Sequence, residues 1–475
     1  MSPTEIKRDN FPKEAVEQTV QAAKIKASSY LSRRTDLRSK ELFAFVSSPQ
    51  ENAECAFSLS KTRDGWQLGV HVADVCEYVV ENSPLDVAVA KRSARINNGF
   101  SKSEMLPDIL VNDICNLAKD EEKLALSVFL DISPDGELQN IKFEESVLKN
   151  GIICLYDEVE QILLTQEASA VHSLRKKYSA YFDSFGDMYE LAAIFCGRRL
   201  SRLGLDCTNY SRVYSLDDEG KITSCRLVAE PDSRAMVREI GYFVAEAVGE
   251  FMLKKNLPCI FNGKKSIPQY ALDYLSNLVE LETEETAPEK LAAMIAEKAK
   301  GNRHYPFVCM ALSESLPASE HSVSPTFNAF CGCDHIVSFF HPATKYTDLL
   351  IQRILKTCIA AKGETANLNL NRQKKAVCSA ADAMNKAEEF IYNTQKHFAR
   401  ESALELLENS TDEEFYGFPL YLDESGAVPV VLECGLKAIV PKEYAENFDF
   451  LPGHEARFQI IALGTNEEAV VVKPV

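Results

Sequence analysis

Alternation of apolar and polar residues predicts a β-hairpin near the N-terminal end of the chain. The pair at residues 64–65 is Asp-Gly, and large apolar side chains occupy every second position after it: Trp66, Leu68, Val70 and Val72. A period of two places these side chains on one face of a strand. Asp-Gly between two alternating runs is the strongest short-range hairpin signal. We therefore expect strands at residues 56–60 and 66–75, joined by a tight turn.

Apolar residues recur at helical spacing in two later segments. They are Met236, Ile240, Phe243, Val244, Ala247, Val248 and Phe251 in the first, and Leu349, Leu350, Ile354, Leu355 and Ile359 in the second. This spacing aligns apolar side chains along one face of an α-helix. Residues 373–407, rich in Ala, Glu and Lys, predict one or two long helices, and residues 12–20 a short one. The acidic run at residues 280–285 is interpreted as a solvated connector.

Beyond about residue 412 the pattern changes to short strands and turns. Apolar or alternating runs cover residues 418–422, 428–432, 458–462 and 467–472. Turn residues lie between them, at residues 424–426 and 463–465. A short series of such strands is typical of a small β-barrel.

Composition and charge restrict the class of protein. A chain of 475 residues is long enough for about two to three domains. It has no apolar run of about 18 residues and no hydrophobic signal core, so no membrane span, membrane partner or secretion is expected. Its 14 cysteines include no CxxC pair, which indicates reduced thiols in a cytoplasmic protein. A net charge of −18 argues against broad nonspecific nucleic-acid binding, although a basic channel inside an acidic shell is not excluded.

Short motifs in a fixed order resemble the RNB domain of the ribonuclease II family, whose members are hydrolytic 3′→5′ exoribonucleases. Residues 36–38 (DLR) and 68–79 (LGVHVADVCEYV) match the family's DLR and LGVHIADVSHYV. Six further motifs of the family are matched in the same order. They are GSPLD at residues 83–86, PMLP at 105–107, RLALSV at 124–128, TYDEV at 156–159, EELMILANEAVA at 238–248 and SPIRRYAD at 342–348. Residues 435–441 (GLKAIVP) are similar to a stretch of the family's RNA-binding OB-fold barrel.

The resemblance implies an α+β fold. We expect an RNB-type domain, in which a mixed sheet with packed helices forms a funnel, and a small C-terminal OB-type β-barrel. The predicted boundaries are residues 1–34 for an N-terminal helical extension, 35–408 for the RNB domain and 409–475 for the barrel. Basic and aromatic residues are sparse on the barrel strands, so contact between the barrel and RNA is left open.

The family's metal-binding aspartates are missing. The family's run close to IDPEDAKDLDDA covers residues 45–56 here, and its first aspartate and its last three fall on Val46, Asn52, Glu54 and Cys55. Magnesium needs several oxygen ligands to activate water and to stabilise the attacking and leaving oxygens. A valine offers no ligand and a cysteine only a soft sulfur. Glu54 is the one aligned carboxylate, with Glu51 nearby, so no metal or other cofactor is expected.

Positions at which the family holds RNA are altered as well. The resemblance places Thr344 where the family has an arginine that contacts the scissile phosphate, and Lys345 retains one charge beside it. Residues that stack RNA bases in the family fall on Asn97 and Cys207. We predict RNA contacts at Lys345, Tyr346 and Asn97, with Lys345 the principal one. A solvated lysine at a helix start is the alternative for Lys345.

Three further groups of residues invite chemical hypotheses. Cys331, Cys333 and His335 could bind zinc, although a CxC pair within a loop is more often incidental. His71 is interpreted as a hydrogen-bonded core histidine in preference to a catalytic one. A nucleophilic thiol at Cys55 is disfavoured, because no histidine base can be assigned to it.

The favoured function is a catalytically inactive pseudonuclease that binds single-stranded RNA or a protein partner. One alternative is a working magnesium-dependent 3′→5′ exoribonuclease that uses Glu54, Glu51 and displaced acids. The other is a protein adaptor without RNA affinity, which the net charge permits. A basic stripe leading to the cleft favours RNA, whereas an acidic cleft mouth with an exposed apolar patch favours the adaptor.

Overall fold

The computed structural model describes most of the chain and divides it into two compact units. The described residues are 10–97, 102–165, 171–206, 208–365, 368–409, 414–419, 426–432, 436–446, 454–462 and 470–475. The first unit comprises Met1–Arg202, Pro231–Gly263 and Ser319–Ile391. The second comprises Leu203–Glu230, Lys264–Ala318 and Tyr392–Val475. Both units are therefore assembled from segments that are far apart in the sequence.

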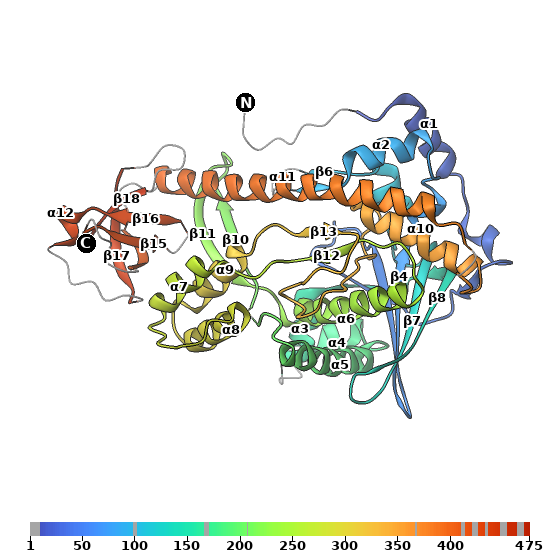
Figure 1. Ribbon diagram of the computed structural model, residues 1–475, viewed down its shortest axis with the longest axis horizontal. Coiled ribbons are helices and arrows are strands. Elements are labelled where there is room, and N and C mark those ends of the chain that lie inside the picture. Colours follow the sequence, from blue (N-terminus) through green and yellow to red (C-terminus); the bar gives the residue numbers. More distant parts are fainter. Residues whose placement is uncertain are drawn as a thin grey trace. The chain divides into compact units, whose positions relative to one another are not determined.

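A seven-stranded mixed sheet forms the centre of the first unit (Figure 1). Its strand order is β1 (Thr35–Leu37), β8 (Leu138–Lys149), β7 (Glu122–Ile132), β4 (Gly65–Ala73), β3 (Cys55–Thr62), β2 (Phe43–Val46) and β9 (Ile152–Leu155). β1–β8 and β2–β9 are parallel pairs, and the other neighbours are antiparallel. The predicted hairpin is confirmed, with Thr62 opposite Gly65 at its tip. Gly65 has φ +130°, which L side chains rarely adopt.

Each face of the sheet packs into its own apolar core. The side chains predicted to share one face of β4 belong to one core: Trp66, Leu68, Val70 and Val72. This core includes residues of α5 (Phe182–Ser201) and α6 (Asp232–Lys254). The second core contains small residues of the central strands: Ala44, Ala56 and Ala73. Burial of both faces is the main contribution to stability, because it removes apolar surface from water.

The remaining elements of the first unit are helices and short ribbons. The helices are α1 (Lys13–Ala22), α2 (Pro84–Arg92), α3 (Tyr156–Leu164), α4 (His172–Lys177), α10 (Tyr346–Ala360) and the first part of α11 (Asn371–Asn409), with single turns at Ala27–Tyr30, Val75–Glu77 and Leu110–Ile114. The ribbons pair β5 (Ile96–Asn97) with β6 (Lys102–Ser103), and β12 (Phe261–Gly263) with β13 (Glu320–Ser322). The helices predicted near the N-terminus and at α6, α10 and α11 are confirmed. Among the described residues, no helix is long and apolar enough to cross a membrane.

The second unit combines a hairpin, the helices α7 to α9, the second part of α11 and a barrel. The hairpin is β10 (Tyr210–Leu216) with β11 (Ile222–Ala229), and the helices are α7 (Gln269–Leu278), α8 (Pro288–Ala299) and α9 (Tyr305–Ser315). The closed barrel has the order β14 (Glu414–Pro419), β15 (Val428–Leu432), β16 (Lys437–Val440), β18 (Val470–Pro474) and β17 (Ala456–Ala462), with α12 (Lys442–Ala445) after β16. Val430, Val440, Phe458 and Val472 belong to its fully buried core.

The barrel predicted beyond residue 412 is therefore confirmed. The connector at residues 280–285 contains neither helix nor strand, as its charge indicated. Of the predicted turns, residues 424–425 and 463–465 lie outside the described residues.

Candidate functional site

The loop from β2 to β3 holds the four positions that align with the aspartates, and the first of them belongs to the core. Val46 ends β2 and is 2% exposed, in the apolar cluster that contains Ala53, Ala73 and Leu349. Parallel pairing of β2 with β9 sets Val46 opposite Leu155. An ionised carboxylate here would be buried among apolar groups, which is costly without a partner.

Hydrogen bonds to side-chain amides hold the second aligned position, Asn52, and its neighbour. Asn52 Nδ2 donates to Asn112 Oδ1 at 2.8 Å. The backbone N–H of the next residue, Ala53, donates to Asn116 Oδ1 at 3.0 Å. Asn112 and Asn116 come from the turn that follows residue 109. Neutral amides therefore hold this part of the loop, where the family has an acid.

Two other groups in the loop, Glu51 and Cys55, do not replace the missing aspartates. The carboxylate of Glu51 accepts a hydrogen bond from the backbone N–H of Ser47 at 2.6 Å, and this bond joins two residues of the same loop. Burial, with a smaller contribution from the charge of Glu54, raises the pKa of the Cys55 thiol to about 12. This thiol is protonated at neutral pH, and a protonated thiol is neither a nucleophile nor a ligand for magnesium.

Glu54, the remaining aligned carboxylate, lies beside a guanidinium and an imidazole. Its side chain is 12% exposed, and Oε1 lies 3.7 Å from Arg95 Nη1. Oε2 lies 3.4 Å from His341 Nδ1. Desolvation opposes the charged imidazole, but hydrogen bonding to Glu54 and its charge outweigh this and raise the pKa of His341. Arg95 therefore offsets the charge of the carboxylate, and His341 lies on its other side.

Hydrogen bonds of the backbone N–H groups position Arg95 and His341, which come from distant parts of the sequence. The backbone N–H of Arg95 donates to the carbonyl of Thr344 at 2.8 Å. The backbone N–H of His341 donates to the buried carboxylate of Asp348 at 3.0 Å. Neither residue was predicted as a site residue. His341 directly precedes the SPIRRY-type motif, which could have drawn attention to it, whereas no pattern singles out Arg95.

The structure places the predicted RNA-contacting residues in different environments. Asn97 is exposed in β5. Tyr346 is half-buried, and its hydroxyl donates to Asp86 Oδ1 in α2 at 3.1 Å. Thr344 is buried, with its hydroxyl directed at a backbone carbonyl 3.4 Å away. Cys207 lies outside the described residues.

Lys345 forms an ion pair within the protein. Its Nζ lies 3.4 Å from Glu388 Oε1, which also lies 3.5 Å from His321 Nε2. Desolvation by itself would raise the pKa of Glu388, but its interactions with His321 and Lys345 outweigh it and lower the pKa to about 2. Glu388 is therefore ionised, and it balances the charge of Lys345. A role of Lys345 in RNA binding stays a prediction.

The carboxylates of a second group of acids are ion-paired with basic side chains of the protein. Asp74, Glu77 and Glu145 lie close enough together to hold a metal ion. Arg34 Nη2 lies 2.7 Å from Asp74 Oδ2 and 2.7 Å from Glu77 Oε2. Lys356 Nζ lies 2.7 Å from Asp74 Oδ2 and 3.0 Å from Glu145 Oε1. Because two cations already face three carboxylates, this cluster is an ion network of the core.

His71 lies between two serine hydroxyls in the sheet. It is fully buried in β4, with Nε2 3.1 Å from Ser58 Oγ and Nδ1 2.8 Å from Ser127 Oγ. Burial, with a smaller effect of the charge of Lys40, lowers the pKa of His71 to about 3. The imidazole is therefore neutral, as the prediction of a hydrogen-bonded core histidine requires.

Acid is expected to destabilise the first unit partly through His71. Its pKa is lower in the folded protein than in the unfolded chain, so the unfolded state binds the extra proton. The stability contributed by neutral His71 is complete above the unfolded pKa and is lost as pH falls toward the folded one, by up to about 1.4 kcal/mol per pH unit. Urea unfolding of the wild type and of His71→Gln at about pH 7 and about pH 5 measures the effect. The variant should lose less stability on acidification, and equal losses would contradict the assignment.

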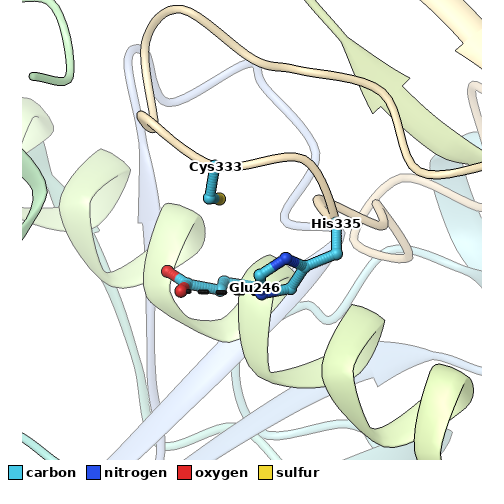
Figure 2. Close-up of side chains that lie close together, drawn as sticks. All are labelled: Glu246, Cys333 and His335. Atoms are coloured by element: carbon cyan, nitrogen blue, oxygen red, sulfur yellow. Dashed lines mark ion pairs between the residues drawn. The ribbon is translucent and has the colours of Figure 1, made fainter. Parts of the chain in front are cut away.

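Cys333 and His335 meet Glu246 of α6, as Figure 2 shows. One potential ligand atom from each of the three lies within 4.8 Å of the others. Cys331, the other cysteine of the predicted zinc group, is not in this cluster. It is buried in an apolar cluster with Ala245 and Ile336. The structure thus separates Cys331 from the other two residues of the zinc hypothesis and places a glutamate from α6 beside them.

Comparison with known proteins decides the family. The model of the RNB domain matches residues 34–361. The chain belongs to the RNB-domain family. Ribonuclease R 1 of Lactococcus lactis is 23% identical over 414 residues, which cover 86% of this chain and 50% of the relative. Ribonuclease R of Chlamydia trachomatis is 26% identical over 417 residues, which cover 82% and 55%. The chain spans about half the length of these curated relatives.

Solved RNB-family structures show the same fold. Ribonuclease R of Mycoplasma genitalium, in complex with ribose-methylated single-stranded RNA, superimposes with a TM-score of 0.79 at 17% identity, covering 98% of this chain and 76% of that one. Yeast Ssd1, a pseudonuclease, gives a TM-score of 0.63 at 18% identity, covering 92% and 53%. The α+β fold of RNB type with a C-terminal barrel of OB type is confirmed. The predicted domain boundaries stay predictions.

The described residues of this RNB-domain chain do not fit a magnesium site at the aligned positions. They supply one carboxylate, which already lies beside the guanidinium of Arg95 and the imidazole of His341. The side chains of Arg95 and His341 remain 35% and 51% exposed. Exposed cations can donate charge-assisted hydrogen bonds to an anion such as a phosphate group. The site therefore exposes a guanidinium and an imidazole beside its single aligned carboxylate.

Proposed function

We propose that this RNB-domain protein is catalytically inactive and binds single-stranded RNA. The observation that carries the proposal is the environment of Glu54, the last aligned carboxylate, which is paired with Arg95 and His341. Magnesium-dependent hydrolysis of a phosphodiester requires metal ions held by several carboxylates. Val46 is buried among apolar residues in the same loop, so this requirement is not met.

The same substitutions make direct binding of phosphate more favourable. A cluster of aspartates without metal ions would repel an RNA phosphate, and like charges at close range cost several kcal/mol in a partly buried site. Here the cluster is replaced by a valine, an asparagine, a cysteine and a glutamate that is ion-paired with Arg95. Loss of catalysis and retention of RNA binding are therefore compatible.

RNA is the ligand class that the family likeness supports. Ribonuclease R of Mycoplasma genitalium, which has the same fold, is known in complex with single-stranded RNA. In this chain the aromatic platforms expected at Asn97 and Cys207 are absent, so we expect phosphate contacts to dominate. Affinity should accordingly be modest and depend strongly on salt. A cytoplasmic location belongs to the same proposal.

Substitution of Arg95 by alanine is expected to weaken RNA binding by about tenfold at low salt, the effect of one charge-assisted hydrogen bond. The slope of log affinity against log salt should fall by about 0.7 for each phosphate that the variant no longer binds. The double variant Lys345→Ala, Glu388→Gln tests Lys345, which the sequence predicts to contact RNA. The second change removes the acid that would otherwise lose its partner. Fluorescence anisotropy with a labelled single-stranded oligonucleotide, at low and physiological salt, measures both effects. Lys142→Ala is a matched control, because Lys142 is also ion-paired, with Glu144, but lies on β8.

The outcomes separate the alternatives. Absence of binding even at low salt would contradict the proposal and favour a protein adaptor. Binding that is equally strong in the Arg95 and Lys345 variants would place the RNA elsewhere, with the C-terminal barrel as the next candidate.

A further inference from the structure

Glu246, Cys333 and His335 bring a carboxylate, a thiol and an imidazole to one point of the first unit. Glu246 projects from α6, and the other two project from the loop that lies over it (Figure 2). His335 Nε2 lies 3.7 Å from Glu246 Oε1. Zinc holds its ligand atoms roughly 3–4 Å apart, as its bond lengths require. The histidine and the glutamate already meet this spacing, and the thiol lies within 4.8 Å of them.

Each of the three residues is oriented by a partner outside the group or by the backbone. His335 Nδ1 lies 2.9 Å from Asp334 Oδ1, which directs Nε2 toward Glu246. The guanidinium of Arg202 donates to both carboxylate oxygens of Glu246, at 2.5 and 2.8 Å. The backbone N–H of His335 is hydrogen-bonded to the thiol of Cys333. Outer partners of this kind fix the tautomer and orientation of metal ligands.

The loop that carries Cys333 and His335 is pressed against α6. A Cβ atom on Gly249 would lie 1.8 Å from the carbonyl oxygen of His335, so only glycine permits this approach. The backbone N–H of Val337 donates to the carbonyl of Ala245 on the same helix at 3.1 Å. Gly332 has φ +64°, the left-handed region that favours glycine, in the turn before Cys333. The loop therefore presents its two side chains to α6 in a preorganised form.

We propose that Glu246, Cys333 and His335 bind one zinc ion, with water as the fourth ligand. A sulfur, an imidazole nitrogen and a carboxylate oxygen form a mixed set that suits zinc, whereas magnesium and calcium require oxygen ligands. On binding, the thiol of Cys333 loses its proton to solvent and forms the zinc–sulfur bond. The thiolate then offsets one of the two charges of the ion, and the carboxylate of Glu246 is shared between the ion and Arg202. Arg202 remains bound to Glu246, because each carboxylate oxygen has a second lone pair.

Metal binding can be measured on the full chain after its metals have been stripped by a chelator. Titration with zinc against a competing chromophoric chelator gives stoichiometry and affinity. Cobalt gives a thiolate-to-metal charge-transfer band in the near ultraviolet. We expect one tight site in the wild type. Cys333→Ser should abolish the cobalt band, and Asp334→Asn, which changes only the partner of His335, should weaken zinc binding about 10–100-fold.

Cys378→Ser is the matched control, because Cys378 is an exposed cysteine of α11 that has no place in the group. It should bind zinc as the wild type does. Zinc should also raise the Tm of the wild type and of Cys378→Ser, but not that of Cys333→Ser. Absence of a tight site in the wild type would overturn the proposal. So would unchanged affinity in both Cys333→Ser and Asp334→Asn, because the metal would then be held by other cysteines.

Discussion

Single-stranded RNA incubated with this protein and magnesium or manganese is expected to remain full length. Removal of one preorganised group that stabilises charge in the transition state typically costs roughly 10²–10³ in rate. Here three of four aligned acids are missing, and the fourth, Glu54, is paired with Arg95 and His341. The arginine position that contacts phosphate in the family holds the buried Thr344. Several such losses leave no catalysis above background.

A 3′-labelled oligonucleotide, analysed on a denaturing gel over several hours, measures this directly. An active ribonuclease R serves as the positive control. Glu54→Ala serves as the control for contaminating nuclease, since it removes the last aligned carboxylate. A ladder of shortened products in the wild type that disappears in Glu54→Ala would show a working nuclease with a rearranged metal site. A ladder that persists in the variant would come from a contaminant.

Rebuilding the four acids is expected to destabilise the protein without creating a nuclease. The variant carries four changes: Val46→Asp, Asn52→Asp, Glu54→Asp and Cys55→Asp. At the first position a charge would enter the apolar cluster around Val46, at a cost of about 3 kcal/mol or more, because the described residues of that cluster offer it no ionic partner. The phosphate-binding arginine and the stacking residues would still be absent, and stacking alone contributes about 1–3 kcal/mol per base.

The single variants Val46→Asp and Val46→Asn separate charge from shape, since the two side chains have nearly the same size. Thermal unfolding of the first unit should show a lower Tm for Val46→Asp than for Val46→Asn at neutral pH. The difference should shrink as pH falls, because a buried aspartate takes up a proton and becomes neutral. Equal Tm values for the two variants would show that Val46 tolerates a charge. Rapid RNA degradation by the fourfold variant would show that loss of metal ligands was the only defect.

Local patterns were sufficient for the elements and for the family. Alternation over Trp66 to Val72 and the Asp-Gly turn located β3 and β4, because a strand exposes its two faces with a period of two. Helical spacing located α6 and α10 for the corresponding reason, a period near 3.6 residues. Loss of the acids was also visible, since it needs only an alignment of residues 46–55 with the family motif.

The partners of the charged side chains depended on tertiary structure. Arg95 and His341 reach Glu54 through backbone pairing of the segment before β5 with the turn before α10. No local pattern specifies such a pairing, because it forms only when both segments pack on the sheet. Lys345 was expected to face RNA, yet its partner Glu388 lies in another helix.

Tertiary packing also decides which side chains lie beside Cys333 and His335. The sequence shows that Cys331, Cys333 and His335 share a loop. It does not show which of their side chains lie close together. Packing of that loop on α6 buries Cys331 among apolar residues and sets Glu246 beside the other two. Secondary structure follows from short-range periodicity, which a sequence displays directly. Sites built from separate segments follow from how those segments pack, and only the folded chain determines that.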